Sequence, residues 1–151
     1  MDSVQRLISL YTYAETNHID VDWFCMQLAE SMSMPIGADQ CAIVIDPLRV
    51  CSIRDEAEKL AHELGHCETG GFYPEYAPLD ERQRQEVRAD RWSIKHVLPF
   101  DHLREAVWAG RETLYDLAEY FDLSEGFIQK AIDYYTGPCG LSFQKILPCD
   151  C

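Results

Sequence analysis

The chain of 151 residues is 47% hydrophobic, a composition that suits one domain with a single core. Its 26 acidic and 13 basic residues give a net charge of −13, and so acidic a surface repels phosphate backbones, which disfavours direct nucleic-acid binding. Residues 1–9 lack the basic-then-apolar order of a signal peptide, and no apolar run approaches the roughly 20 residues that cross a bilayer, so we expect a cytoplasmic protein with no membrane partner.

Seven cysteines are scattered along the chain, and their number is odd. Without an export signal, free thiols are the expected state of such cysteines. The only clustered pair has one intervening residue, which is tighter than the usual CxxC spacing of zinc and redox sites. The seven are Cys25, Cys41, Cys51, Cys67, Cys139, Cys149 and Cys151.

The first third of the chain is predicted to contain two helices and two short strands. Apolar residues recur at helical spacing over residues 2–16. Asp20 is a suitable N-cap for a second helix over residues 21–32. A short strand at 33–36, a turn, and an apolar strand at 41–45 follow.

Helices dominate the rest of the chain, and Asp80 with Gln83 resembles a capping box at the start of the second of them. The predicted helices cover residues 53–68, 81–98, 101–110, 113–121 and 124–136. We therefore expect a single, mostly helical α+β domain over residues 1–151 with a very small sheet. Its parts are N-terminal helices (1–36), a strand and site helices (37–100), C-terminal helices (101–136) and a tail (137–151).

The segment His62-Glu63-Leu64-Gly65-His66 matches the HExxH pattern. Residues four apart lie one turn apart on one helix face, so the two imidazoles can share one Zn²⁺ ion. Glu63 lies beside them and can act as the catalytic base that takes a proton from the metal-bound water. Gly65 costs helix stability and makes sense where another backbone or a ligand approaches closely. The alternative is a solvated helix face that matches the pattern by chance.

A third ligand is available on the next helix. Glu86 lies 20 residues after His66, and a catalytic zinc site commonly uses two histidines and one glutamate. Asp90 lies one turn beyond Glu86, where it can bind the outer ring nitrogen of a ligating histidine. In the alternative interpretation, Glu86 and Asp90 pair with Arg82 or Arg88 at the surface.

The stretch LAHELGHCETGG at 60–71, together with Glu86-Val87-Arg88-Ala89-Asp90-Arg91-Trp92 and the closing Leu98-Pro99, resembles the ImmA/IrrE family of metallo-endopeptidases. The resemblance covers about residues 38–136 and implies a minimal zincin-like metallopeptidase. It assigns His62, His66 and Glu86 to the zinc and Glu63 to catalysis. The spacing of Glu86 and Asp90 also resembles thermolysin-like zincins, in which the aspartate supports a ligand without binding the metal.

The family resemblance implies a substrate. Its better-understood members cleave or inactivate a helix-turn-helix repressor of a phage, a mobile element or a stress response. Larger relatives carry a sensory domain, which we do not expect in a chain of this length. The alternative function is a non-proteolytic regulator that binds a repressor or antitoxin partner, although such a binder has no need of Glu63.

Residues 113–136 resemble a helix-turn-helix unit, with Thr113 and Ser124 as N-caps of its two helices. DNA binding requires basic residues on the second helix. Lys130 is the only basic residue in this segment, against five acidic ones, for a net charge of −4. We interpret the segment as a packing unit or a protein-docking surface.

Four further residues near the motif have two interpretations each. A phenol from Tyr73 or Tyr76 can stabilise an oxyanion, but anchoring of the loop is favoured for either one. His96 can do the same, although its apolar neighbours favour a structural role. Cys67 directly follows His66 and can act as a supplementary ligand or redox sensor, with a small buried residue as the favoured interpretation.

Overall fold

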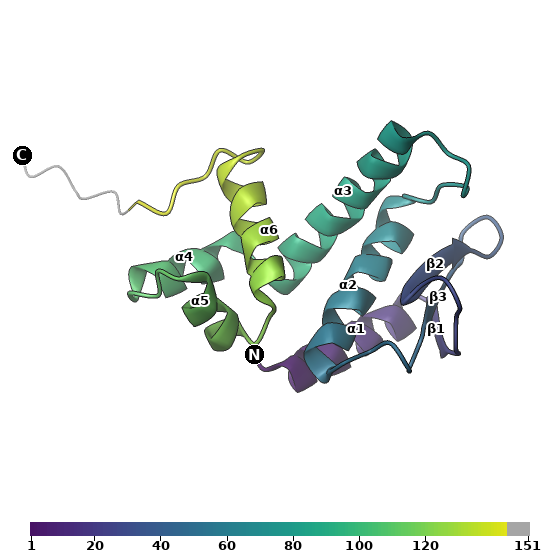
Figure 1. The fold of residues 1–151 in the computed structure, drawn as a ribbon, viewed down its shortest axis with the longest axis horizontal. Coiled ribbons are helices and arrows are strands. Elements are labelled where there is room, and N and C mark those ends of the chain that lie inside the picture. The colour runs from purple at the N-terminus through teal and green to yellow at the C-terminus, as the bar shows by residue number, and fades with distance from the viewer. Residues whose placement is uncertain (145–151) are drawn as a thin grey trace, which may run out of the picture.

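The computed structural model describes residues 1–144. Within them the chain forms a mostly helical α+β domain with one small sheet, as predicted (Figure 1). In chain order the elements are α1 (Ser3–Thr16), β1 (Asp20–Trp23), β2 (Ser31–Pro35), β3 (Cys41–Ile45), α2 (Ile53–Thr69), α3 (Leu79–Val97), α4 (Phe100–Trp108), α5 (Leu114–Phe121) and α6 (Glu125–Thr136). None of the helices in this range combines the length and the apolar character that crossing a membrane requires.

The sheet has the order β1-β3-β2, with β1 parallel and β2 antiparallel to the central strand. Ile43 and Ile45 of β3 are fully buried and pack with the apolar side of α2. Along β2 the residues alternate, with Ser31 and Ser33 partly covered and Met32 exposed. The sheet therefore packs against α2 through β3, and β2 is one of its two outer strands.

The prediction of a helix at residues 21–32 is wrong. Asp20 begins strand β1 instead of capping a helix, and a loop then leads into β2, which starts at Ser31, before the predicted residue 33. Val21 pairs with Ile43 of the parallel strand β3, and these two residues are far apart in the sequence. This non-local pairing overrides the local helical pattern. The predicted turn between β2 and β3 is present, with Gly37 at a positive φ of 88°.

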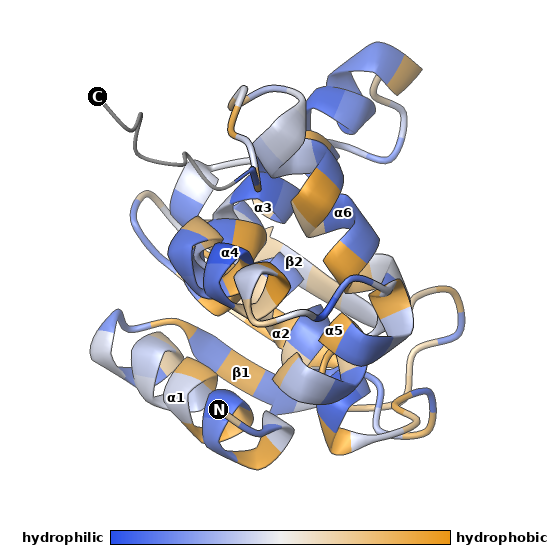
Figure 2. Cartoon of the chain, turned by 90° about the vertical axis from the view of Figure 1, so that its left-hand side faces the viewer, coloured by the Kyte–Doolittle hydropathy of each residue, from blue (hydrophilic) through white to orange (hydrophobic). Residues whose placement is uncertain are grey.

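The helices of the second half begin and end close to their predicted positions. Thr113 and Ser124 cap α5 and α6 through their side chains, as predicted. The capping box predicted for α3 is wrong, because the helix begins at Leu79 after Pro78 and has no side-chain cap. Figure 2 shows hydrophobic and hydrophilic residues alternating along α1, α5 and α6, as expected of helices that bury one face.

The apolar side chains gather in two clusters. One lies between α1, the sheet and α2, and includes Leu10, Ile43 and Leu60. The other joins the end of α3 to α4, α5 and α6, and includes Leu103 and Ile128. Val97 at the end of α3 packs against both clusters, which makes this helix the connection between the two halves.

A disulfide joins Cys41 at the start of β3 to Cys67 near the end of α2. The prediction of free thiols is therefore wrong for this pair, although Cys25, Cys51 and Cys139 are free. The two α-carbons lie 5.8 Å apart, inside the range that a disulfide bridges, because β3 packs against α2 at this point. Cys149 and Cys151 lie outside the described residues.

The turn between α5 and α6 is fastened to α1 and α2. Asp122 has a positive φ of 50°, and its carboxylate accepts hydrogen bonds from the Ser3 backbone N–H and from Arg54 of α2. The buried Arg6 guanidinium donates to the Asp122 and Phe121 carbonyls, at the C-terminus of α5. The bonds from Ser3 and Arg54 lower the pKa of Asp122 to about 2.

We expect Asp122→Asn to weaken the fold in a pH-dependent way. Asparagine keeps the left-handed backbone but not the charge, so the free energy of unfolding at pH 7 should fall by about 1 kcal/mol, allowing for solvent screening of a partly exposed pair. Because the folded-state pKa lies below the unfolded value, the difference should be complete above about pH 4 and should shrink as the pH falls toward 2. Urea unfolding between pH 2 and 7 measures it.

Asp39→Asn is the matched control, since Asp39 is an exposed loop residue. It should unfold like the wild type at every pH. A difference between Asp122→Asn and the wild type that stays constant down to pH 2 would show that the charge of Asp122 contributes nothing.

Candidate metal centre

Helices α2 and α3 lie side by side (Figure 1). At Gly65 their backbones come very close. A Cβ atom at this position would lie 2.5 Å from the carbonyl oxygen of Ala89, which is far inside any normal contact distance. The glycine predicted to permit a close approach therefore does so. This contact brings His62 and His66 of α2 opposite Glu86 of α3.

The three side chains converge on one point. Nε2 of His62 lies 3.1 Å from Nε2 of His66 and 3.1 Å from Oε2 of Glu86, and Nε2 of His66 lies 3.3 Å from Oε1 of Glu86. Donors that share a tetrahedral zinc ion at roughly 2.0–2.2 Å lie about 3.3–3.6 Å apart. Among the residues of the described range, these three form the group that could hold a metal ion.

Each histidine is oriented by a hydrogen bond at its other nitrogen. Nδ1 of His62 lies 3.0 Å from Oδ1 of Asp90, and Nδ1 of His66 lies 2.8 Å from the Gly71 carbonyl oxygen. Both acceptors require a proton on Nδ1, which leaves each Nε2 lone pair free to bind a metal. Gly70 ends α2 in the left-handed conformation, and this turn directs the Gly71 carbonyl back toward His66.

The electrostatics at this point favour a cation. Burial lowers the pKa of His62, but hydrogen bonds to Asp90 and Glu86 and the charge of Glu63 outweigh burial and raise that pKa to about 9. Hydrogen bonds from His62 and His66 hold the pKa of Glu86 well below its usual range. In the metal-free protein, a proton thus supplies the positive charge, and a metal ion can take its place.

Glu63 is buried beside this group and is not one of its three members. Its Oε1 accepts a hydrogen bond of 2.7 Å from the Ser31 hydroxyl at the start of β2. The Tyr73 hydroxyl donates to Oε1 of Glu86 at 2.5 Å, and this bond, with burial, raises the pKa of Tyr73 to about 12. Tyr73 thus joins the loop after α2 to a candidate ligand, whereas the anchoring interpretation placed it against the core.

The remaining candidates lie away from the centre. Tyr76 is 88% exposed, and His96 stacks on Trp92 at the surface, away from the three converging side chains. Cys67 is half-buried and committed to its disulfide.

Surface pairing of Glu86 and Asp90 with arginine is not what the structure shows. Arg82 donates to the Ala77 carbonyl, and Arg88 donates to the Thr69 carbonyl and to Gln85. Glu86 instead faces His62 and His66, and Asp90 faces His62 and Lys130.

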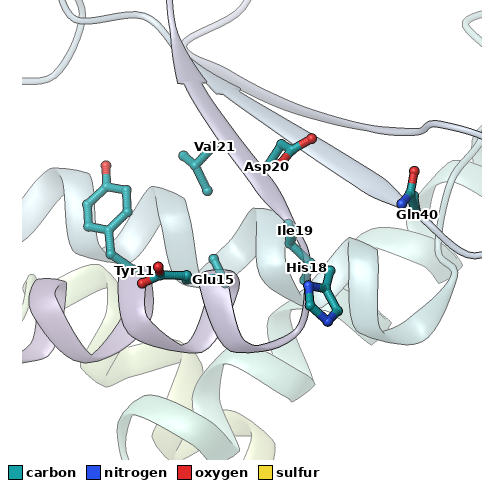
Figure 3. A pocket seen from close by; sticks show the side chains of 8 residues that line it. Tyr11, Glu15, His18, Ile19, Asp20, Val21 and Gln40 are labelled. Carbon is teal, nitrogen blue, oxygen red and sulfur yellow. The ribbon is translucent and has the colours of Figure 1, made fainter.

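A cleft of about 340 Å³ opens beside His62 and Asp90, bounded by Ser31 of β2 and Lys130 of α6. A larger hollow of about 540 Å³ lies elsewhere, between the end of α1 and β1 (Figure 3). Its lining includes Tyr11, Glu15, His18, Asp20 and Gln40, and none of the three converging residues. Of these two cavities, the smaller cleft is the one that reaches the candidate metal centre, at His62.

Three residues of the centre could not be picked out from the sequence by their spacing. Ser31 fell inside a predicted helix, although it touches Glu63. The Gly71 carbonyl acts through the backbone, and its one signal was the Gly-Gly pair at the helix end. Lys130 bonds Asp90 across 40 residues, and nothing in a local pattern connects the two.

Two histidines one helical turn apart, a facing glutamate and a buried glutamate beside them match the arrangement that metallopeptidases use to hold a metal. Residues 53–133, more than half of the chain, match the family model described as the IrrE N-terminal-like domain of Peptidase_M78. The chain belongs to this family, and the resemblance noted in the sequence is confirmed. No curated protein and no solved structure matches it significantly.

Gly65→Ala should destabilise the protein and disturb the metal centre. Alanine normally favours a helix by about 1 kcal/mol over glycine, but here its Cβ would collide with the Ala89 carbonyl. Overpacking of this kind should lower the free energy of unfolding by about 1–3 kcal/mol. Denaturant titration of the metal-free protein measures the change.

Gly126→Ala on α6 is the control, because the nearest atom to its added Cβ is 3.9 Å away. This variant should be as stable as the wild type or slightly more so. Equal stability of the two alanine variants would contradict the tight contact between α2 and α3.

Proposed function

We propose that the protein is a zinc-dependent endopeptidase of the cytoplasm, with zinc held by His62, His66 and Glu86. The observation that carries this proposal is the convergence of three residues: the two Nε2 atoms lie 3.1 Å apart, each lies 3.1–3.3 Å from an oxygen of Glu86, and both outer ring nitrogens are already anchored. Two neutral imidazoles and one carboxylate suit zinc and leave a fourth position for water or substrate. Asp90 supports His62 without binding the metal.

Glu63 is the general base of the proposed reaction. When bound, zinc supplies a Lewis acid for the peptide carbonyl and lowers the pKa of a water molecule. Glu63 takes the proton of that water and then delivers it to the leaving amine. The Ser31 hydroxyl donates to Oε1 of Glu63 and so holds the carboxylate in one orientation while its other oxygen stays available.

The edge strand offers a place for an extended peptide. In the described part of the chain, β2 pairs with β3 on one side only. A peptide that adds to the other side of β2 would pass Ser31 and therefore Glu63. Hydrogen bonds between β2 and the main chain of a peptide do not depend on the sequence of the peptide. Specificity for one substrate must therefore come from contacts outside β2.

The proposed substrate is a helix-turn-helix repressor of a phage or mobile element. The family resemblance supports it, and so does the net charge of −13, which complements the basic surface of a DNA-binding protein. We further propose that the α5–α6 unit does not bind nucleic acid, since its net charge is −4. The competing function is a non-proteolytic regulator that works by binding such a repressor.

If the metal assignment is right, substituting a ligand should reduce zinc binding more than substituting Asp90. His62→Ala, His66→Ala and Glu86→Ala should each abolish stoichiometric zinc, because two remaining ligands bind it poorly. Asp90→Ala should weaken zinc binding by roughly 10–100-fold without abolishing it. Elemental analysis and competition with a chromophoric chelator measure both effects. Full zinc content in Glu86→Ala, or none in Asp90→Ala, would reverse the roles of these two residues.

Metal binding and catalysis should separate at Glu63. Glu63→Gln keeps size and hydrogen-bonding capacity but removes the base, so zinc should stay bound while cleavage falls by roughly 10²–10⁴-fold or more. Zinc content and cleavage of a helix-turn-helix repressor, the proposed substrate class, are measured in parallel.

Glu68→Gln, an exposed change on the same helix, serves as the control and should keep both properties. If Glu63→Gln relieves repression in cells as well as the wild type does, the binding-only regulator replaces the endopeptidase.

A further inference from the structure

One face of α2 is bonded to the α5–α6 unit at successive turns. Arg54 donates to Oδ1 of Asp122 at 2.7 and 2.9 Å, and Glu58 accepts from the Ser124 N–H and hydroxyl at 2.6 and 2.7 Å. The next residue at this spacing is His62, a candidate zinc ligand. The unit that resembles a helix-turn-helix thus lies along the metal-binding helix, and its second helix extends to the metal centre.

The link at His62 passes through Asp90 to Lys130. The Lys130 ammonium donates to Oδ2 of Asp90 at 3.0 Å and to Oδ1 at 3.2 Å. Oδ1 is the same atom that lies 3.0 Å from Nδ1 of His62. The carboxylate stands at the junction of α2, α3 and α6, with a bond to each of the other two helices.

We propose that Lys130 is a positioning residue of the metal centre. Its ammonium holds the Asp90 carboxylate in the orientation that accepts the His62 Nδ1 proton, and this keeps Nε2 of His62 directed at the metal. The inference rests on the proposed zinc site. It assigns a function to α6 that neither HExxH nor the Glu86 spacing implies.

A purely structural ion pair would behave differently. The Lys130 side chain is 59% exposed, and an ion pair this accessible to water contributes little to stability. Asp90 is 27% exposed, and without Lys130 it keeps one side-chain partner among residues 1–144, so its carboxylate is freer to turn away from His62. Lys130 should therefore affect metal affinity much more than folding.

A direct electrostatic effect on the metal has the opposite sign. A lysine charge close to a bound cation repels it, so its removal would tighten metal binding if charge alone mattered. Loss of positioning weakens binding instead. The sign of the change in zinc affinity therefore separates the two mechanisms.

The test compares zinc dissociation constants, measured by chelator competition, and Co²⁺ absorption spectra. Lys130→Met should weaken zinc binding by about 3- to 10-fold, less than the roughly 10- to 100-fold effect of a partner that bonds a ligating histidine directly. Lys130→Arg should restore the affinity to near the wild-type value, since a guanidinium can hold the same carboxylate. Lys95→Met, an equal charge change at an exposed position of α3, should have no effect.

A double-mutant cycle establishes that Lys130 acts through Asp90. In an Asp90→Asn background, Lys130→Met should cause no further loss of zinc affinity. The inference is overturned if Lys130→Met leaves binding unchanged or tightens it, or if the loss persists in that background. Should Lys130→Met fail to fold, Lys130→Gln replaces it in the same cycle. A wild-type chain that binds no zinc would overturn the proposed function itself, whereas equal affinities across the variants would overturn only this inference.

Discussion

The contact between Gly65 and Ala89 is the constraint on which the metal centre depends. Imidazole and carboxylate side chains are short, so donors from two helices can share one ion only where the backbones nearly touch. A methyl group at position 65 would lie 2.5 Å from the Ala89 carbonyl oxygen, so α2 and α3 would have to move apart and with them the side chains that now lie 3.1–3.3 Å from one another. The helix thus contains its least favourable residue at the point where the site requires it.

The charged side chains around this contact carry a net negative charge that a divalent cation would balance. Glu63, Glu86 and Asp90 carry three negative charges, and Lys130 supplies one positive charge when both histidines are neutral. A divalent ion is what balances the remainder, and without it a proton on His62 compensates in part, which is why the pKa of His62 rises to about 9. Unpaired carboxylates at a packed helix junction would otherwise be costly.

The convergence of the candidate ligands could be predicted because the pattern is local. His62, Glu63 and His66 lie within two turns of one helix, and Glu86 and Asp90 within one turn of the next, so helical spacing alone places them. Strand β1 and the Cys41–Cys67 disulfide could not be predicted, since both depend on contacts between segments distant in the sequence.

Ser31 and Lys130 were missed for the same reason, because each reaches the centre from an element whose position the sequence does not specify. Local patterns thus identified the three residues that converge. The residues that orient them became visible only when the helices and the sheet were packed together.

The α5–α6 unit shows how a helix-turn-helix pattern can serve an internal purpose. In a DNA-binding unit the first turn of the second helix and its basic residues face the major groove. Here the N-cap of that helix, Ser124, is bonded to Glu58, and Lys130, the only basic residue of the unit, is bonded to Asp90. Ser124 and Lys130 are therefore both bonded to carboxylates of α2 and α3, and the role proposed for Lys130 is to keep His62 aligned with its neighbours.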